Sequence, residues 1–108
     1  MKTNVSKTIY QDAYPNGNSR AIFLEIENGE VSMCQYDMGP ACDSFYGDDE
    51  YERIISGIEL KKMMTLLCVG NIYEFVQKMQ NSFGFSDGLD QFSSFLEKNN
   101  IEYQYHSC

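Results

Sequence analysis

Apolar side chains recur at every second position between residues 20 and 27, which is the period of a strand with one buried face. The apolar positions on one side are Ile22, Leu24 and Ile26, whereas Phe23 and Glu25 lie on the other side. The pair Asn28-Gly29 follows directly and is the strongest short signal for a two-residue hairpin turn. Alternation resumes between residues 31 and 36. The pattern therefore predicts an antiparallel hairpin over residues 20–37.

Three further segments carry strand patterns. Residues 3–11 alternate weakly, and turn-forming residues at 15–18 separate them from the hairpin. Residues 51–56 contain two adjacent isoleucines, and β-branched residues are typical of strands. Residues 101–106 alternate between isoleucine or tyrosine on one face and polar residues on the other. We expect a strand from each of these segments.

The region between the last two of these strands has helical spacing. A first helix is expected to open at Ser56, because Ser56 and Glu59 fit a capping box. A second opens at Asn71, which with Glu74 resembles another cap, and a third runs from Ser86 or Asp87 to residues 99–100. The inward stripes of the three helices are Leu60, Met63, Met64 and Leu67, then Ile72, Phe75, Val76, Met79 and Phe83, then Leu89, Phe92, Phe95 and Leu96.

A short turn or helix is expected between residues 39 and 47, since Pro40 suits a first helical position and Gly47 suits the residue past a helix end. The resulting order of elements predicts an α+β fold. Its sheet is antiparallel or mixed with about four or five strands, and about three helices pack mainly on one face. At 108 residues, the chain is expected to form a single domain over residues 1–108.

The charge balance narrows the choice of partner. Eight basic and sixteen acidic residues leave a net charge of −8. A nucleic-acid-binding surface needs a stripe of Lys and Arg, and the only basic pair is Lys61-Lys62, so no direct nucleic-acid partner is expected. Strong acidity favours a partner protein with a basic surface. The plainer alternative is that negative charge only keeps a small protein soluble.

The chain carries no signal for a membrane or for export. No apolar core follows Met1, and the longest apolar stretch, Met63–Val69, is too short to span a bilayer. We therefore expect a cytoplasmic location without membrane association, in which the cysteines stay reduced. Of these cysteines, Cys34, Cys42 and Cys68 are expected as small core residues.

Catalytic chemistry has little support in the sequence. The motifs of phosphate loops, zinc proteases and α/β-hydrolases do not occur. His106 is the only histidine, and an exposed place on an edge strand is a better interpretation than a general base. The cysteines have no zinc-binding spacing, and Met63, Met64 and Met79 are expected in the core. The sequence thus predicts a protein that is not an enzyme and has no cofactor or metal.

An acidic stretch from Asp37 to Glu52 is the most conspicuous candidate site. It holds six carboxylates in sixteen residues, no basic residue, and several interleaved aromatic residues. Three interpretations stay open: a solvated loop, a protein-binding patch with aromatic anchors and a charged rim, and a divalent-cation site that lacks the EF-hand spacing. The candidate partner-binding residues are Tyr36, Asp37, Asp43, Tyr46, Asp48, Asp49, Glu50, Tyr51 and Glu52.

Two segments carry a resemblance, YDMGPACDSFYGDDEYE at residues 36–52 and FLEKNNIEYQYHS at residues 95–107. With the helical region between them, the chain from residue 20 to residue 107 resembles a group of small bacterial α+β proteins that has no established activity. The matching positions are Asp37, Gly39, Pro40, Asp43, Gly47, Glu50, Tyr51 and Glu52. The chain departs from the group in its many Cys and Met residues and in Asn99-Asn100, where a turn containing Gly is common. The resemblance supports the fold and implies no substrate or catalytic residue.

Small size, acidity and missing catalytic motifs favour a protein-binding inhibitor, such as an immunity protein that neutralises a toxin by masking its basic surface. The close alternative is a phage-type inhibitor that imitates nucleic-acid charge and blocks a defence nuclease. An enzyme or metal-binding module that uses the 37–52 stretch is a further possibility. So is a housekeeping homodimer paired through the strand that holds Tyr103 and Tyr105, and both monomer and homodimer stay open.

Overall fold

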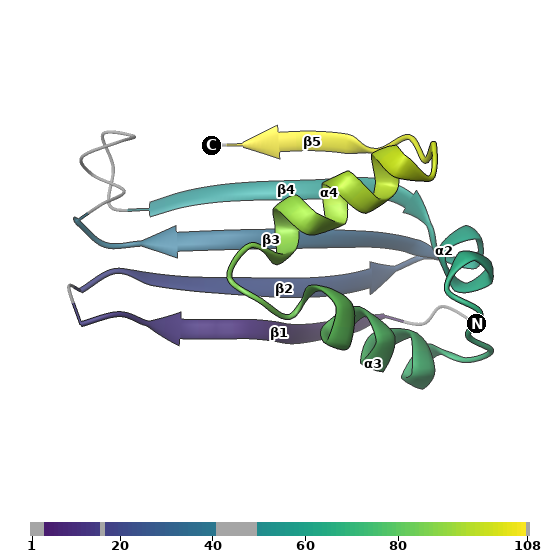
Figure 1. Ribbon diagram of the computed structural model, residues 1–108, viewed down its shortest axis with the longest axis horizontal. Helices are drawn as coiled ribbons and strands as arrows, with labels where there is room; N and C mark the ends of the chain where they lie inside the picture. The colour runs from purple at the N-terminus through teal and green to yellow at the C-terminus, as the bar shows by residue number, and fades with distance from the viewer. Residues whose placement is uncertain (1–3, 16, 41–49, 108) are drawn as a thin grey trace.

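The computed structural model describes residues 4–15, 17–40 and 50–107. Five strands form one open antiparallel sheet in the order β1-β2-β3-β4-β5 (Figure 1). The strands are β1 (Val5–Ala13), β2 (Ser19–Glu27), β3 (Glu30–Met38), β4 (Glu50–Glu59) and β5 (Gln104–Ser107). The described helices are α2 (Leu60–Leu66), α3 (Ile72–Phe83) and α4 (Gly88–Lys98). The predicted α+β fold is confirmed, and every strand pair is antiparallel.

The hairpin of β2 and β3 forms where the alternation and the Asn-Gly pair predict it. Asn28 and Gly29 both adopt positive φ, 54° and 78°, as the twist-matched two-residue turn requires. Glu27 pairs with Glu30 directly beside this turn. The turn therefore fixes the register that places every second residue of both strands under the helices.

Helices α3 and α4 cover one face of the sheet, and α2 lies at its end (Figure 1). The covered face and the inward helix stripes form one core, in which each fully buried large apolar side chain contributes about 1.5–3 kcal/mol. The ring of Phe83 packs edge-on against Phe92 and Phe95, with ring centroids 5.1 and 5.8 Å apart. The fully buried large side chains are Ile22, Leu24, Ile26, Met33, Ile55, Ile58, Met63, Phe75, Met79, Leu89, Phe92 and Leu96.

The predicted helix start at Ser56 is wrong. β4 continues to Glu59, and α2 begins at Leu60 without a side-chain cap. Between residues 55 and 58, β4 has one residue more than the facing part of β3, and Gly57 adopts the positive φ of 77° that the resulting bulge needs. This bulge places the Ile58 side chain in the core. Its burial stabilises the protein more than a side-chain cap at Ser56 would.

The remaining local predictions are confirmed only in part. Asn71 caps α3 as expected, because its side-chain oxygen accepts a hydrogen bond from the backbone N–H of Glu74 at 2.9 Å. Asp87 precedes α4 but makes no side-chain cap. The last strand is shorter than the predicted 101–106 and leaves His106 exposed at the sheet edge. Cys68 is exposed rather than part of the core, since it lies in the connection that follows α2.

None of the helices in the described part of the chain has the length and apolar character that crossing a membrane requires.

Candidate functional site

The face of the sheet opposite the helices is the candidate site. Residues alternate between the two faces of a strand, so those between the buried positions point away from α3 and α4. One continuous row crosses all five strands on this side. Its members, in register, are Thr8, Phe23, Cys34, Ile54 and His106. We call this surface the uncovered face, because no described element lies over it (Figure 1).

The centre of the uncovered face is apolar. Phe23 on β2, Cys34 on β3 and Ile54 on β4 are direct cross-strand neighbours. Tyr36 and Ala21 pair in the next row along the strands. All five side chains are half-buried by their neighbours in the sheet. The centre thus presents a flat apolar strip rather than a cavity.

Glutamates flank this strip on both sides. Glu25, Glu27 and Glu30 lie toward the Asn-Gly turn, and Glu52 and Glu50 lie toward the opposite end of the sheet. Glu30 pairs with both Glu27 and Glu59, and like charges directly opposite one another destabilise a sheet. No ion pair within the described residues joins these glutamates to a lysine or arginine. These neighbouring glutamates therefore concentrate negative charge at the turn end of the uncovered face.

None of the described basic residues occupies an outward strand position of the uncovered face. On the strands, Lys7 and Arg20 are on the helix side by register, and Arg53 reaches α4. The remaining four are on the helices: Lys61, Lys62, Lys78 and Lys98. Charge is thus segregated: among the described residues, the rows of the uncovered face hold glutamates but no Lys or Arg.

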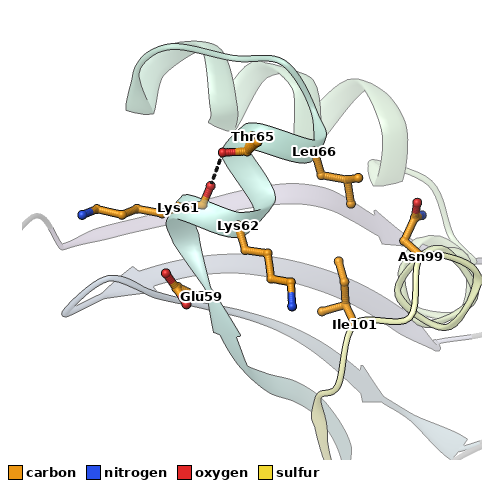
Figure 2. A pocket seen from close by; sticks show the side chains of 7 residues that line it. All are labelled: Glu59, Lys61, Lys62, Thr65, Leu66, Asn99 and Ile101. Atoms are coloured by element: carbon orange, nitrogen blue, oxygen red, sulfur yellow. Dashed lines mark hydrogen bonds between the residues drawn. The ribbon is translucent and has the colours of Figure 1, made fainter.

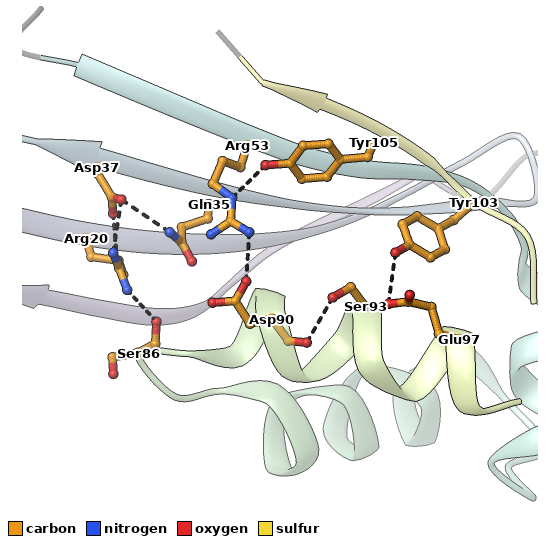
Figure 3. Close-up of polar contacts among 10 residues, drawn as sticks. All are labelled: Arg20, Gln35, Asp37, Arg53, Ser86, Asp90, Ser93, Glu97, Tyr103 and Tyr105. Carbon is orange, nitrogen blue, oxygen red and sulfur yellow. Dashed lines mark hydrogen bonds and ion pairs between the residues drawn. The ribbon is translucent and has the colours of Figure 1, made fainter. Parts of the chain in front are cut away.

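On the helix side, a polar cluster joins the sheet to the start of α4 (Figure 3). The Arg20 guanidinium donates from Nε and Nη2 to the two carboxylate oxygens of Asp37, at 2.7 and 3.1 Å. Its Nη1 donates to the backbone oxygen of Ser86 at 2.9 Å. Gln35 is 1% exposed and donates to Asp37 at 3.2 Å. The Oε1 atom of Gln35 has no hydrogen-bond partner among the described residues.

Arg53 makes the second link to α4 in this cluster. It donates from Nη2 to Asp90 at 2.7 Å and from Nε to the hydroxyl of Tyr105 at 2.9 Å. Arg20 thus ties β2 to Ser86, two residues before α4, and Arg53 ties β4 to Asp90 in the first turn of α4. These contacts hold α4 in place on the sheet. The cluster contains no nucleophile with an adjacent base, so it has a structural role rather than a catalytic one.

A groove between α2 and the connection from α4 to β5 has a volume of about 450 Å³ (Figure 2). Leu66 and Ile101 give it an apolar floor, and Lys62 reaches toward Ile101 from the helix. Glu59 also lines it, so opposite charges meet there and no single ligand charge is favoured. The other lining residues are Lys61, Thr65 and Asn99.

The structure divides the predicted partner-binding residues between the two faces. By register, Tyr36, Glu50 and Glu52 lie on the uncovered face, whereas Asp37 and Tyr51 lie on the helix side. Asp43, Tyr46, Asp48 and Asp49 lie outside the described residues. Among the described residues, no group of three or more His, Cys, Asp or Glu side chains can hold a metal ion.

Sequence reasoning missed most of the uncovered face. Phe23 and Ile54 interrupt polar positions of their strands, and Glu25, Glu27 and Glu30 surround the hairpin turn. The signal in the sequence is the set of outward positions in the alternating strands. A large apolar side chain at such a position does not contribute to the core and can belong to a binding surface. Only the register shows that these residues meet in adjacent rows.

Comparison with known proteins identified no matching family, no similar curated protein and no similar solved structure. The functional proposal therefore rests on the geometry and charge of the uncovered face.

Proposed function

We propose that the protein is an acidic binding domain that masks a basic surface of a partner protein, in the manner of an inhibitor or an immunity protein. The observation that carries this proposal is the segregation of charge: the uncovered face is apolar at its centre and acidic on both sides, and the described basic residues lie elsewhere. Opposite potentials steer two proteins together and select against partners of the wrong charge.

The dimensions of the uncovered face suit a protein partner. Five strands about 4.8 Å apart give a width of about 19 Å, and nine-residue strands give a length of about 30 Å. The resulting area of about 600 Å² approaches the ~800 Å² that each partner contributes to a standard interface. A flat surface of this size is less suited to a small molecule, which binds in concave sites.

The apolar strip separates this proposal from imitation of nucleic acid. A charge mimic needs acidic groups along its whole contact surface, whereas Phe23, Cys34 and Ile54 fill the middle row of the uncovered face. Apolar anchors inside a charged rim are typical of protein–protein interfaces. We therefore favour the protein-masking function over the nucleic-acid mimic.

Charge reversal with a matched control tests the proposal. The face variant combines Glu30→Lys with Glu52→Lys. The control variant combines Asp87→Lys with Glu102→Lys, two exposed positions outside the strands, one directly before α4 and one in the connection from α4 to β5. Each pair changes the net charge by four units, from −8 to −4. The two variants therefore differ in where the charge is, not in how much there is.

Each variant is used as bait in co-purification from the organism that encodes the protein, at about 0.1 M and about 1 M salt, where the screening length falls from about 10 to about 3 Å. We expect a stoichiometric basic partner with wild type and with the control variant, and its loss with the face variant. Equal recovery by both variants would contradict the proposal. If wild type recovers no partner at high salt, the nucleic-acid mimic is favoured, because salt screens charge–charge attraction but does not weaken an apolar contact.

A further inference from the structure

The border of the apolar strip on β1 differs from its border on β4. Rows of the uncovered face can be followed from β1 to β4 through the register of the strands. Two neighbouring rows are Gln11, Ala21, Tyr36 and Glu52, and then Ala13, Ser19, Met38 and Glu50. Both rows are therefore uncharged at the β1 end and acidic at the β4 end.

The apolar part of these rows lies over β2 and β3. Met38 is 41% exposed, and the half-buried Tyr36 is two residues away from it on the same face of β3. Phe23 and Cys34 continue this surface toward the turn, and Ile54 widens it onto β4 in their row. From Met38 to Cys34 the strip is about 13 Å long. Its long sides therefore face β1 and β4.

No charged residue of the described chain borders the strip on the β1 side. The outward residues of β1 beside it are Thr8, Gln11 and Ala13, and all three are exposed. The charged residues of β1, Lys7 and Asp12, lie on the helix side by register and have opposite signs. A partner that reaches across β1 therefore meets polar groups without a net charge.

The β4 side of the strip is acidic and accessible. Glu50 and Glu52 are two residues apart on the same face of β4. β5 ends its pairing opposite Arg53, so no described strand lies outside these two glutamates. Their carboxylates therefore stand at the edge of the sheet. A second acidic border lies at the turn end and consists of Glu25, Glu27 and Glu30.

We propose that the partner binds the uncovered face in a single orientation, with apolar contact residues over β2 and β3, basic residues over β4 and the turn, and uncharged polar residues over β1. The inference rests on the proposed function and specifies the contact surface of the partner. That surface is an apolar anchor bordered by Lys or Arg on two adjoining sides only. Complementary charges across an interface fix its register and exclude wrong alignments.

A partner rotated by half a turn in the plane of the sheet fits the charges less well. Its basic residues would lie over Gln11 and Ala13, and its uncharged residues over the two glutamates of β4. Carboxylates that lose water without gaining an opposite charge are costly. A second copy of this chain offers the same acidic borders and is repelled. The charges of the uncovered face therefore select both the partner and its direction.

Relocation of charge within the two rows tests this orientation. The relocated variant moves the carboxylates of both rows from β4 to β1 and consists of Gln11→Glu, Ala13→Glu, Glu50→Ala and Glu52→Gln. The control variant combines Asn81→Asp with Asp87→Asn, two exposed positions outside the sheet. Each variant keeps the net charge of −8. General attraction of cations is therefore the same in all three proteins.

The probe is a synthetic peptide of about seven residues with blocked ends, about 23 Å long when extended, compared with about 14 Å from β4 to β1. One half is lysine, the other half is leucine and tryptophan, and a nitroxide is attached to the apolar end. The nitroxide broadens NMR signals of nearby backbone amides, which are measured on the full chain at millimolar peptide. With wild type and the control variant, we expect at least about threefold stronger broadening in β1 than in β4, because exposed ion pairs favour one direction of the peptide. With the relocated variant, we expect the reverse order.

The outcomes separate this inference from the proposed function. The same order of broadening in wild type and in the relocated variant would overturn the inference, as would broadening confined to the helix side or no broadening at all. If co-purification nevertheless depends on Glu30 and Glu52, the masking function stands and the orientation is wrong. If the order reverses but no partner is recovered, the orientation stands and the masking function is wrong.

Discussion

Replacing Asp37 with asparagine tests the strongest polar contact of the helix side. The Asp37 side chain is 13% exposed and Arg20 is 33% exposed. Asp37 accepts two hydrogen bonds from Arg20 and one from Gln35. Asparagine has the same shape, but it carries no charge and has an NH₂ group in place of one carboxylate oxygen. This NH₂ group faces N–H donors and cannot accept a hydrogen bond from them.

The expected cost follows from the degree of burial. Removing one partner of a fully buried ion pair costs about 3–5 kcal/mol, whereas exposed pairs contribute about 0–1 kcal/mol. Arg20 keeps access to water, so the cost lies between these limits, at about 2 kcal/mol. For a domain of 108 residues, this lowers the unfolding midpoint by about 10 °C.

Urea and thermal unfolding, followed by circular dichroism, measure the effect. Glu50→Gln is the matched control, because it makes the same acid-to-amide change at an exposed position of the neighbouring strand and is expected to cost less than about 0.5 kcal/mol. A double-mutant cycle with Arg20→Met should show a coupling of about 1 kcal/mol or more. Additive single effects, or an Asp37→Asn midpoint equal to that of Glu50→Gln, would refute the reasoning.

Three further predictions concern single sites. Gly88→Ala should destabilise the fold by about 2–3 kcal/mol in urea unfolding, because its Cβ would clash with the backbone oxygen of Phe83 at the end of α3, whereas Gly70→Ala, with no atom closer than 3.7 Å, should not. Asn71→Ala should cost about 1 kcal/mol by removing the cap of α3, and Asn71→Asp should restore most of it; equal losses would contradict the cap. The hydrogen bond between the Tyr10 and Tyr14 hydroxyls, which the protonated Tyr10 can donate, raises the pKa of Tyr10 to about 12 together with burial, so Tyr14→Phe should lower that pKa toward about 10 in a tyrosinate absorbance titration. The protonated form is favoured in the fold, so this contribution to stability is complete below pH ~10 and lost as the pH rises through ~12.

The fold was largely predictable because its signals are local. Alternation in residues 20–27, the Asn-Gly turn and the helical stripes each act within a short segment of about twelve residues or fewer, and they agree with one another. The start of α2 was not predictable in this way. Burial of Ile58 beside Val31 decides it, and that contact depends on the register of two strands rather than on the residues around Ser56.

The candidate site was predictable only in its charge. The sequence shows an acidic run and outward aromatic residues, but it does not show which carboxylates share a face. Asp37 and Glu52 belong to the same acidic stretch, yet pairing places Asp37 beside Arg20 and Glu52 on the uncovered face. Phe23 and Ile54 are far apart in sequence and become neighbours only through Cys34 between them.

The connectivity of the sheet has a consequence for how the chain folds. β1 to β4 follow one another in sequence and in space, so each pairing closes a short segment of chain. β5 pairs with β4 only after the helical region of residues 60–103 has been crossed. Closing that longer loop costs more entropy before any contact compensates for it. The short β5 is therefore expected to join last during folding and to detach first under stress, and amide hydrogen exchange at its edge should be the fastest of the five strands.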